Sequence, residues 1–207
     1  MLRNPQGLAT AVVTLLGLNV LFDLLLGVSE VMTLADPGGP TSLFADASLV
    51  QLGVGDLVVY LATVVLFVIW FYRVRLNANV WAFDRQSRTA GWAIGSWFIP
   101  IANLWIPRQI AVDVWRASRR DPSAADGPGE LTLLNCWWTF FVVGDIVDRV
   151  ATRLYGRAET TDALATAAAW SLAGYLLTIV AAVLAILFVR RLTSMQHAKA
   201  TGMLSAA

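Results

Sequence analysis

The sequence predicts an all-α integral membrane protein, a single polytopic membrane domain covering residues 1–207. Hydrophobic residues make up 57% of the chain, charged residues make up only 14%, and the mean hydropathy is +0.65. Because a soluble domain carries about 25% charged residues, most of this chain is expected to lie in lipid. Apolar runs of about 20 residues, separated by short polar segments, indicate the membrane-spanning helices.

Four apolar runs are predicted to be transmembrane helices. They are Leu8–Val28, Leu52–Tyr72, Leu131–Val147 and Ala163–Val189. The first run is longer than the roughly 7–15 residues of a signal-peptide core, and no small-residue cleavage site follows it. We therefore expect it to be a membrane anchor.

The stretch Gly91–Val112 is also apolar, but Pro100 and Pro107 interrupt it. Each proline removes a backbone donor and breaks helix continuity. Asn103 lies between them, and its side chain is expected to satisfy carbonyl groups that the prolines leave free. We predict a re-entrant or interfacial segment here, and a fifth transmembrane helix is the alternative.

The distribution of basic residues favours four spans with both termini in the cytoplasm. The loop 29–51 contains Glu30, Asp36 and Asp46 but no Lys or Arg, which places it outside. If Gly91–Val112 does not cross, three basic residues of the 15 lie outside, namely Arg149, Arg153 and Arg157. A crossing segment would divide the basic residues almost equally.

Aspartates lie in or beside each of the four predicted spans, at Asp23, Asp56, Asp145, Asp148 and Asp162. With the N-terminus inside, they all come at the outer ends of their helices. A carboxylate in hydrocarbon costs about 2.5–3.5 kcal/mol, so such residues usually face the protein interior and mark function. We expect Asp23 and Asp145 to face each other in a polar pocket. Their polar neighbours, one helical turn away, are Asn19 and Arg149.

These acids also allow structural interpretations. Asp56, Asp148 and Asp162 lie near enough to helix ends to be hydrated, and a first-turn aspartate favours the helix dipole. Asp145 and Arg149 can form a simple ion pair. The run Asp145-Ile-Val-Asp148 resembles part of a diphosphate-binding acidic motif, but two carboxylates fall short of the set that carries Mg²⁺. We therefore expect neither a metal nor another cofactor.

The chain contains nine tryptophans. Four of them suit a belt at the membrane interface, namely Trp70, Trp81, Trp92 and Trp115. Aromatic faces stabilise cations by about 0.5–2 kcal/mol, so other rings are predicted to line the pocket. These are Trp97, Trp137, Trp138, Phe141 and Trp170. An acid beside such rings, with water excluded, is what carbocation chemistry on an isoprenoid requires.

The segment from about 60 to 120 carries a distinctive pattern. Trp70-Phe-Tyr-Arg73 is followed by Gly91-Trp92, and then by Trp97-Phe-Ile-Pro100-Ile-Ala-Asn103-Leu-Trp-Ile-Pro107-Arg-Gln109. In spacing and residue type this pattern resembles a bacterial family of small membrane proteins known only as a domain of unknown function. The resemblance implies a multi-pass protein of the bacterial cell membrane and assigns no activity.

The size, the number of spans and the acid-plus-tryptophan content resemble a second group, the bacterial membrane-bound terpene cyclases of the drimentine and xiamycin types. Those enzymes use no cofactor, act on prenylated indoles, and begin cyclisation by protonating an alkene or epoxide of a farnesyl chain. This resemblance implies a protonation-initiated, isomerase-type cyclase of a farnesylated indole or related meroterpenoid precursor in secondary metabolite biosynthesis. No residue is carried over from that group.

From the residues themselves, the predicted acid is Asp145, ahead of Asp23, Asp56 and Asp148. Asn19 and Arg149 are expected to contact the substrate together with the rings. The expected partners are a hydrophobic prenylated small molecule and the lipid bilayer, and no basic stripe indicates nucleic acid. A structural or partner-binding membrane protein without chemistry is the alternative. A proton-coupled transporter is a third hypothesis, and the lack of inverted repeats counts against it.

Overall fold

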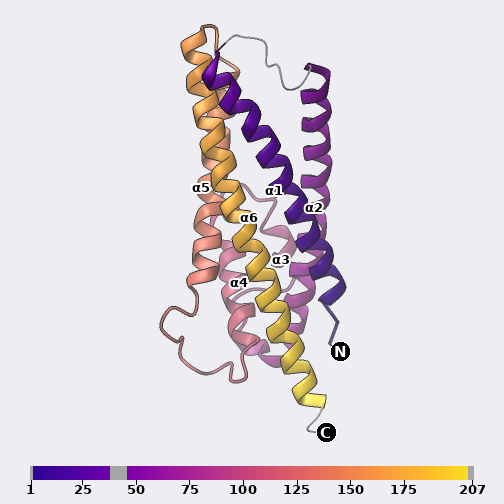
Figure 1. Ribbon diagram of the computed structural model, residues 1–207. Helices are drawn as coiled ribbons and strands as arrows, with labels where there is room; N and C mark the ends of the chain where they lie inside the picture. The colour runs from indigo at the N-terminus through magenta and orange to yellow at the C-terminus, as the bar shows by residue number, and fades with distance from the viewer. Residues whose placement is uncertain (1, 38–45, 205–207) are drawn as a thin grey trace. The chain divides into compact units, whose positions relative to one another are not determined.

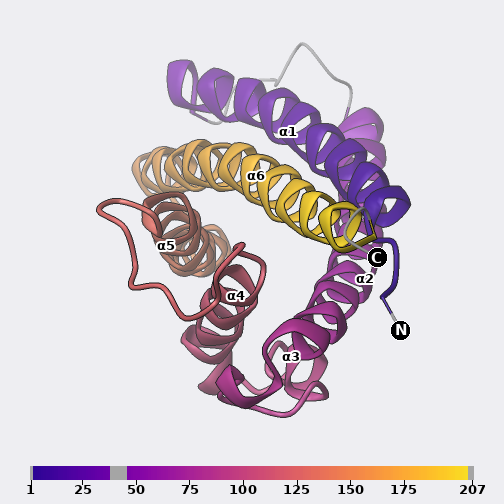
Figure 2. The same cartoon turned by 90° about the horizontal axis from the view of Figure 1, so that it is seen from below.

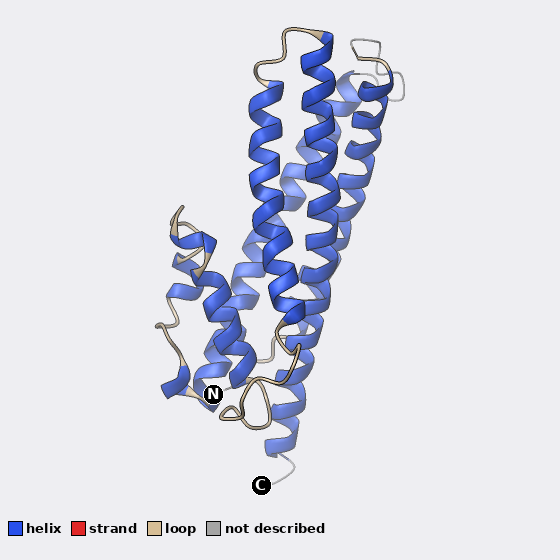
Figure 3. Cartoon of the chain, turned by 90° about the vertical axis from the view of Figure 1, so that its left-hand side faces the viewer, coloured by secondary structure: helices blue, strands red, loops and turns tan. Residues whose placement is uncertain are grey.

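The computed structural model describes residues 2–37 and 46–204, and no strand occurs among them (Figure 3). The elements follow one another along the chain as Figure 1 shows. They are α1 (Gln6–Ala35), α2 (Asp46–Trp81), η1 (Phe83–Arg85), α3 (Trp92–Gly95), η2 (Ala102–Leu104), α4 (Ile106–Ala117), α5 (Thr132–Tyr155) and α6 (Thr161–Leu204).

The four predicted spans fall in α1, α2, α5 and α6, and each of these helices continues beyond the C-terminal end of its apolar run. Three of them, α1, α2 and α6, are long and apolar enough to cross a membrane. Helix α5 has 24 residues, about 36 Å of helix. It is less apolar because Asp145, Asp148, Arg149 and Arg153 fall in its second half. Over the residues that the structure describes, the protein is therefore all-helical, with three candidate membrane-spanning helices.

The proline-interrupted stretch forms short helices separated by turns. Pro107 lies in the first turn of α4, where the missing backbone donor costs nothing. Pro100 lies in the turns between α3, which ends at Gly95, and η2. The Asn103 side chain was predicted to donate to carbonyl groups that the prolines leave free, and the described part of the chain contains no such hydrogen bond. The backbone N–H of Asn103 donates to the carbonyl of Ile99 at 2.8 Å, and its buried Oδ1 atom has no hydrogen-bond partner there.

The chain divides into two compact units, and each long helix contributes one segment to each unit. The terminal unit contains residues 1–14, 63–136 and 184–207, and the acidic unit contains residues 15–62 and 137–183. Both chain ends belong to the terminal unit. Within it, the beginning of α1 and the end of α6 lie beside each other (Figure 2).

Aromatic rings form the core of the terminal unit. Trp70 and Phe188 are fully buried, with an edge-to-face contact and ring centroids 6.0 Å apart. Trp115 stacks on the same Phe188 ring at 6.1 Å. Both rings fill space between helices, where burial of their large apolar surfaces stabilises the packing. Their depth in a membrane stays a prediction.

Candidate functional site

Asp23 is the buried acid of the acidic unit. It lies in the middle of α1, one turn after Asn19, and the two side chains are on one face of the helix. Both residues are buried, and Asp23 is only 7% exposed. Asn19 donates to the carbonyl of Leu15 at 2.8 Å. The Oδ2 atom of Asp23 has no hydrogen-bond partner among the residues that the structure describes. Asp23 thus presents a buried carboxyl with an unused oxygen.

The electrostatic neighbours of Asp23 are Asp56 on α2 and Asp148 on α5. Asp56 is half-buried and Asp148 lies at the surface of the chain. The neighbour on α5 is therefore Asp148 rather than Asp145, which corrects the expectation that Asp23 and Asp145 face each other. The reason is helical periodicity, because a shift of three residues turns a side chain by about 60° around the axis. Three carboxyl groups from three helices of this unit therefore influence one another electrostatically.

Asp145 lies outside this cluster, on the uncovered side of α5. Its side chain is 44% exposed and that of Arg149 is 68% exposed. Arg149 donates from Nε and Nη2 to the two carboxylate oxygens of Asp145, at 2.8 and 3.1 Å. This bidentate ion pair between residues one turn apart satisfies both groups without help from another helix. The structure places Arg149 in this surface pair and not beside Asp23.

A second polar contact joins helices of the acidic unit. The hydroxyl of Tyr155 on α5 donates to Glu30 on α1. Ser171 on α6 is also a hydrogen-bond neighbour of Glu30. Sequence reasoning placed Glu30 in a loop, but α1 continues to Ala35 and keeps Glu30 in the helix. The available signal was its spacing of seven residues from Asp23, which puts both acids on one face of α1.

The predicted aromatic lining divides between the two units. Trp137 and Trp138 are buried in the acidic unit, with ring centroids 5.8 Å apart, and Trp138 also contacts Phe141 at 5.5 Å. Trp170 belongs to the same unit but is 42% exposed. Trp97 belongs to the terminal unit, where its ring contacts Phe67 and Phe71 edge-on, at 5.6 and 6.0 Å. Trp137, Trp138 and Phe141 thus form a cluster of contacting rings within the unit of Asp23.

The terminal unit contains a buried hydrogen-bond network that sequence reasoning did not find. Gln196 on α6 is 1% exposed, and its Nε2 donates to the carbonyl of Val74 at 3.0 Å and to the Ser118 hydroxyl at 3.1 Å. Its Oε1 accepts from Asn77 at 3.0 Å. Asn77 is fixed in turn by Arg3, whose backbone N–H and carbonyl both bond to it at 2.8 Å. The network ties α2, α6, the end of α4 and the start of the chain together.

The loop after α4 is held by ion pairs outside the candidate spans. Arg116 and Arg119 both bond Asp126, and their hydrogen bonds hold the pKa of that carboxyl well below its usual range. Glu130 accepts from Trp115 Nε1 at 3.0 Å and from Arg119 Nε at 2.6 Å. These contacts fix the loop on α4.

Asp162 lies in the first turn of α6 and is exposed, at a position where its charge favours the helix dipole. Within residues 2–37 and 46–204, no group of three or more His, Cys, Asp or Glu side chains is arranged to hold a metal ion. The acid cluster around Asp23 is thus the candidate site.

Comparison with known proteins gives a family without an activity. Residues 41–194 match a family described as a domain of unknown function, DUF4328. No curated protein and no solved structure matches the chain. Asp56 and Asp148 lie within the matched residues, and Asp23 precedes them.

Proposed function

This chain belongs to the DUF4328 family, and from its acidic unit we propose that it is a membrane-embedded protein in which Asp23 holds and transfers a proton. The observation that carries the proposal is the buried Asp23 carboxyl with an unpartnered oxygen among the described residues, beside Asp56 and Asp148. A carboxylate without a cationic partner is costly in apolar surroundings, whereas the protonated form is neutral. Asp23 is therefore suited to carry a proton that a bound molecule can receive.

The reaction that this acid performs, in this proposal, is cyclisation of a prenylated indole or a related meroterpenoid precursor. Asp23 gives its proton to a terminal alkene or epoxide of the prenyl chain. The alkene π bond or one C–O bond of the epoxide breaks, a new C–H or O–H bond forms, and a carbocation results. An internal double bond attacks the cation and closes the ring. A C–H bond next to the new cation then breaks, its proton passes to the carboxylate of Asp56 or Asp148, and its electron pair forms a new double bond. Transfer of that proton back to Asp23 restores the acid. The product is an isomer of the substrate, so no other reactant is consumed.

The aromatic side chains support this chemistry because they come from the same unit as the acid. Phe141 and Trp138 precede Asp148 on α5 by seven and ten residues, about 10 and 15 Å along the helix. This spacing puts the rings along the length of a prenyl chain rather than at its protonated end. Their faces attract the travelling positive charge.

The membrane arrangement in this proposal has four spans, with both termini on the cytoplasmic side of a bacterial cell membrane. The Gln196 network supports it, because the ends of α2, α4 and α6 all meet there. Lys199 also donates to the carbonyl of Ala117 at 2.9 Å, which holds the end of α6 against the end of α4. The chain between α2 and the end of α4 therefore leaves and returns to one side, as a re-entrant segment does.

The test compares Asp23→Asn with Asp145→Asn in cells supplied with farnesylated indoles. General acid catalysis contributes about 10²–10⁴-fold, so Asp23→Asn is expected to lower formation of cyclised isomers at least about 100-fold. Asp145→Asn alters only the surface pair with Arg149 and is expected to retain turnover within about threefold, since exposed pairs contribute little. Mass spectrometry with chromatographic separation detects the isomers.

Two outcomes separate the parts of this proposal. Equal turnover in the two variants, at equal expression, excludes Asp23 as the acid. Absence of any cyclised isomer from the unaltered protein excludes the reaction but leaves the proton site. Infrared difference spectra of Asp23→Asn against the unaltered protein then test whether Asp23 is protonated, because the C=O stretch of a protonated carboxyl lies at a higher frequency than that of an amide or a carboxylate.

A structural or partner-binding role is the alternative, and the packing of the rings favours it. Trp137 and Trp138 are buried against neighbouring side chains, so a substrate reaches their faces only when those side chains move. Under this alternative Asp23→Asn changes the amount of folded protein and no metabolite. Fluorescence size-exclusion chromatography of both variants distinguishes that outcome from a loss of turnover.

A further inference from the structure

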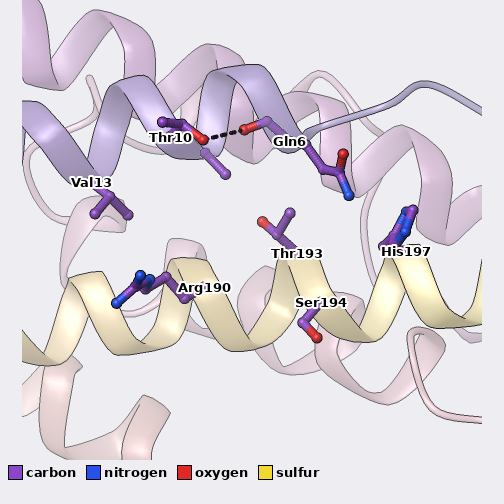
Figure 4. A pocket seen from close by; sticks show the side chains of 8 residues that line it. Gln6, Thr10, Val13, Arg190, Thr193, Ser194 and His197 are labelled. Carbon is purple, nitrogen blue, oxygen red and sulfur yellow. Dashed lines mark hydrogen bonds between the residues drawn. The ribbon is translucent and has the colours of Figure 1, made fainter.

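A polar groove lies between the beginning of α1 and the end of α6, within the terminal unit. Its volume is about 460 Å³, within the range of ligand sites. Figure 4 shows Arg190, Thr193 and His197 of α6 on the side that faces α1. The lining residues are Gln6, Ala9, Thr10, Val13, Arg190, Thr193, Ser194 and His197.

The groove carries positive charge and hydrogen-bond donors but no acid. Arg190 supplies a permanent cation, and among the described residues its guanidinium pairs with no carboxylate. Gln6 and His197 add exposed polar side chains. The hydroxyl oxygen of Thr193 accepts from Trp70 Nε1 at 3.1 Å, which fixes this side chain in the wall of the groove. The free donors therefore fit an anion with several acceptor oxygens, and a guanidinium binds phosphate with two parallel hydrogen bonds.

The groove lies where two apolar runs end. Arg190 directly follows Val189, the last residue of the apolar run of α6, and Gln6 comes two residues before the run of α1 begins at Leu8. The polar headgroup layer is about 5–7 Å thick on each side of a bilayer, and seven residues of helix from Arg190 to His197 cover about 10 Å. The cationic groove is therefore at headgroup depth. Ala9 and Val13 give its wall an apolar part that continues toward the hydrocarbon.

We propose that this α1–α6 groove binds one anionic phospholipid, whose phosphate is held by Arg190. His197 and Gln6, at the other end of the groove, are donors to the outer oxygens of the headgroup. The glycerol and the first methylene groups lie against Ala9 and Val13. Basic pockets between transmembrane helices recognise anionic headgroups in this way. The site is separate from the acid cluster, because all its lining residues belong to the terminal unit.

The chain offers a matched pair of arginines for the test. Arg190 lines the groove, whereas the adjacent Arg191 does not, and both are exposed. The protein is reconstituted with phosphatidylglycerol or with phosphatidylcholine, extracted in mild detergent, and examined by native mass spectrometry for bound lipid. One basic residue near an anionic surface contributes about fivefold to binding. We expect Arg190→Gln to retain about fivefold less phosphatidylglycerol, and Arg191→Gln to retain as much as the unaltered protein.

Further arms identify the ligand. Phosphatidylcholine is expected to be retained less than phosphatidylglycerol, and millimolar inorganic phosphate is expected not to displace the lipid. Equal retention of phosphatidylglycerol by Arg190→Gln and Arg191→Gln, with matching size-exclusion profiles, would overturn the proposal. Displacement by inorganic phosphate would overturn the lipid as the ligand and assign the groove to a soluble phosphate compound. Arg190→Lys, which keeps the charge without the planar pair of donors, is expected to lose less than Arg190→Gln.

Discussion

Replacing Gln196 by methionine removes the side chain that completes the buried network of the terminal unit. Methionine has a similar length but forms no comparable hydrogen bond, so the change isolates the polar contacts. Gln196 donates to Val74 and Ser118 and accepts from Asn77, all at 3.0–3.1 Å. Both N–H bonds of its amide are used, and the site is closed to water.

The expected loss follows from what each partner keeps. Ser118 still donates to the carbonyl of Val114 at 2.7 Å, and Asn77 keeps both bonds to Arg3. Hydrogen bonds between transmembrane helices contribute about 0.6 kcal/mol each, and buried bonds in water-soluble proteins about 1 kcal/mol. Loss of the Gln196 bonds should therefore lower the free energy of unfolding by about 2–3 kcal/mol.

The measurement is reversible unfolding by sodium dodecyl sulfate in mixed micelles, followed by tryptophan fluorescence. The matched control is Ala198→Met, which adds the same side chain to an exposed position of α6. We expect the control to change the free energy of unfolding by less than about 0.5 kcal/mol. A loss for Gln196→Met no larger than that of the control would refute the assignment of these hydrogen bonds.

Acid should release the loop after α4, because hydrogen bonds from Arg116 and Arg119 lower the pKa of Asp126 in the folded protein. A lowered pKa contributes its full stabilisation above the unfolded pKa of about 3.9, and that stabilisation is lost progressively as pH falls from there to the folded pKa. A spin label in the loop should therefore begin to gain mobility at about pH 4 and gain more at lower pH. With Asp126→Asn the loop should be mobile at every pH. Gly53→Ala should stabilise α2 by about 0.5–1 kcal/mol, because a Cβ atom there meets no atom within 4 Å. Gly55→Ala should stabilise α2 less than Gly53→Ala does, or destabilise it, since the new Cβ would lie 3.2 Å from a phenylalanine ring of α1. Equal changes in the free energy of unfolding in detergent would contradict this close contact between the helices.

The periodicity and length of apolar runs predicted the long helices because both depend on local sequence. The match to a family of unknown function also confirms the resemblance seen in the segment from Trp70 to Gln109. Helix ends were less predictable, because polar residues continue a helix outside the apolar run. Glu30 was assigned to a loop for this reason, although α1 carries it to the contact with Tyr155.

The partners of polar side chains were not predictable from the sequence, since they depend on which helix faces are covered. Asp145 and Asp148 differ by only three positions, and the pattern of apolar residues did not show which one turns toward Asp23. Asn77 and Gln196 gave no local signal either, because their contact joins residues 119 positions apart. Such contacts are set by tertiary packing.

The same separation has a consequence for biosynthesis. At about 5–20 residues per second, a ribosome makes Gln196 about 6–24 s after Asn77, whereas helices form in about a microsecond or less. The nascent α2 therefore waits seconds for the last helix. During that time Arg3, already synthesised, can hold Asn77, and Ser118 can bond Val114 within its own helix. Gln196 then bonds side chains that already have another hydrogen-bond partner. Asn77 and Ser118 therefore need not lie in the bilayer without a hydrogen bond while the chain is unfinished.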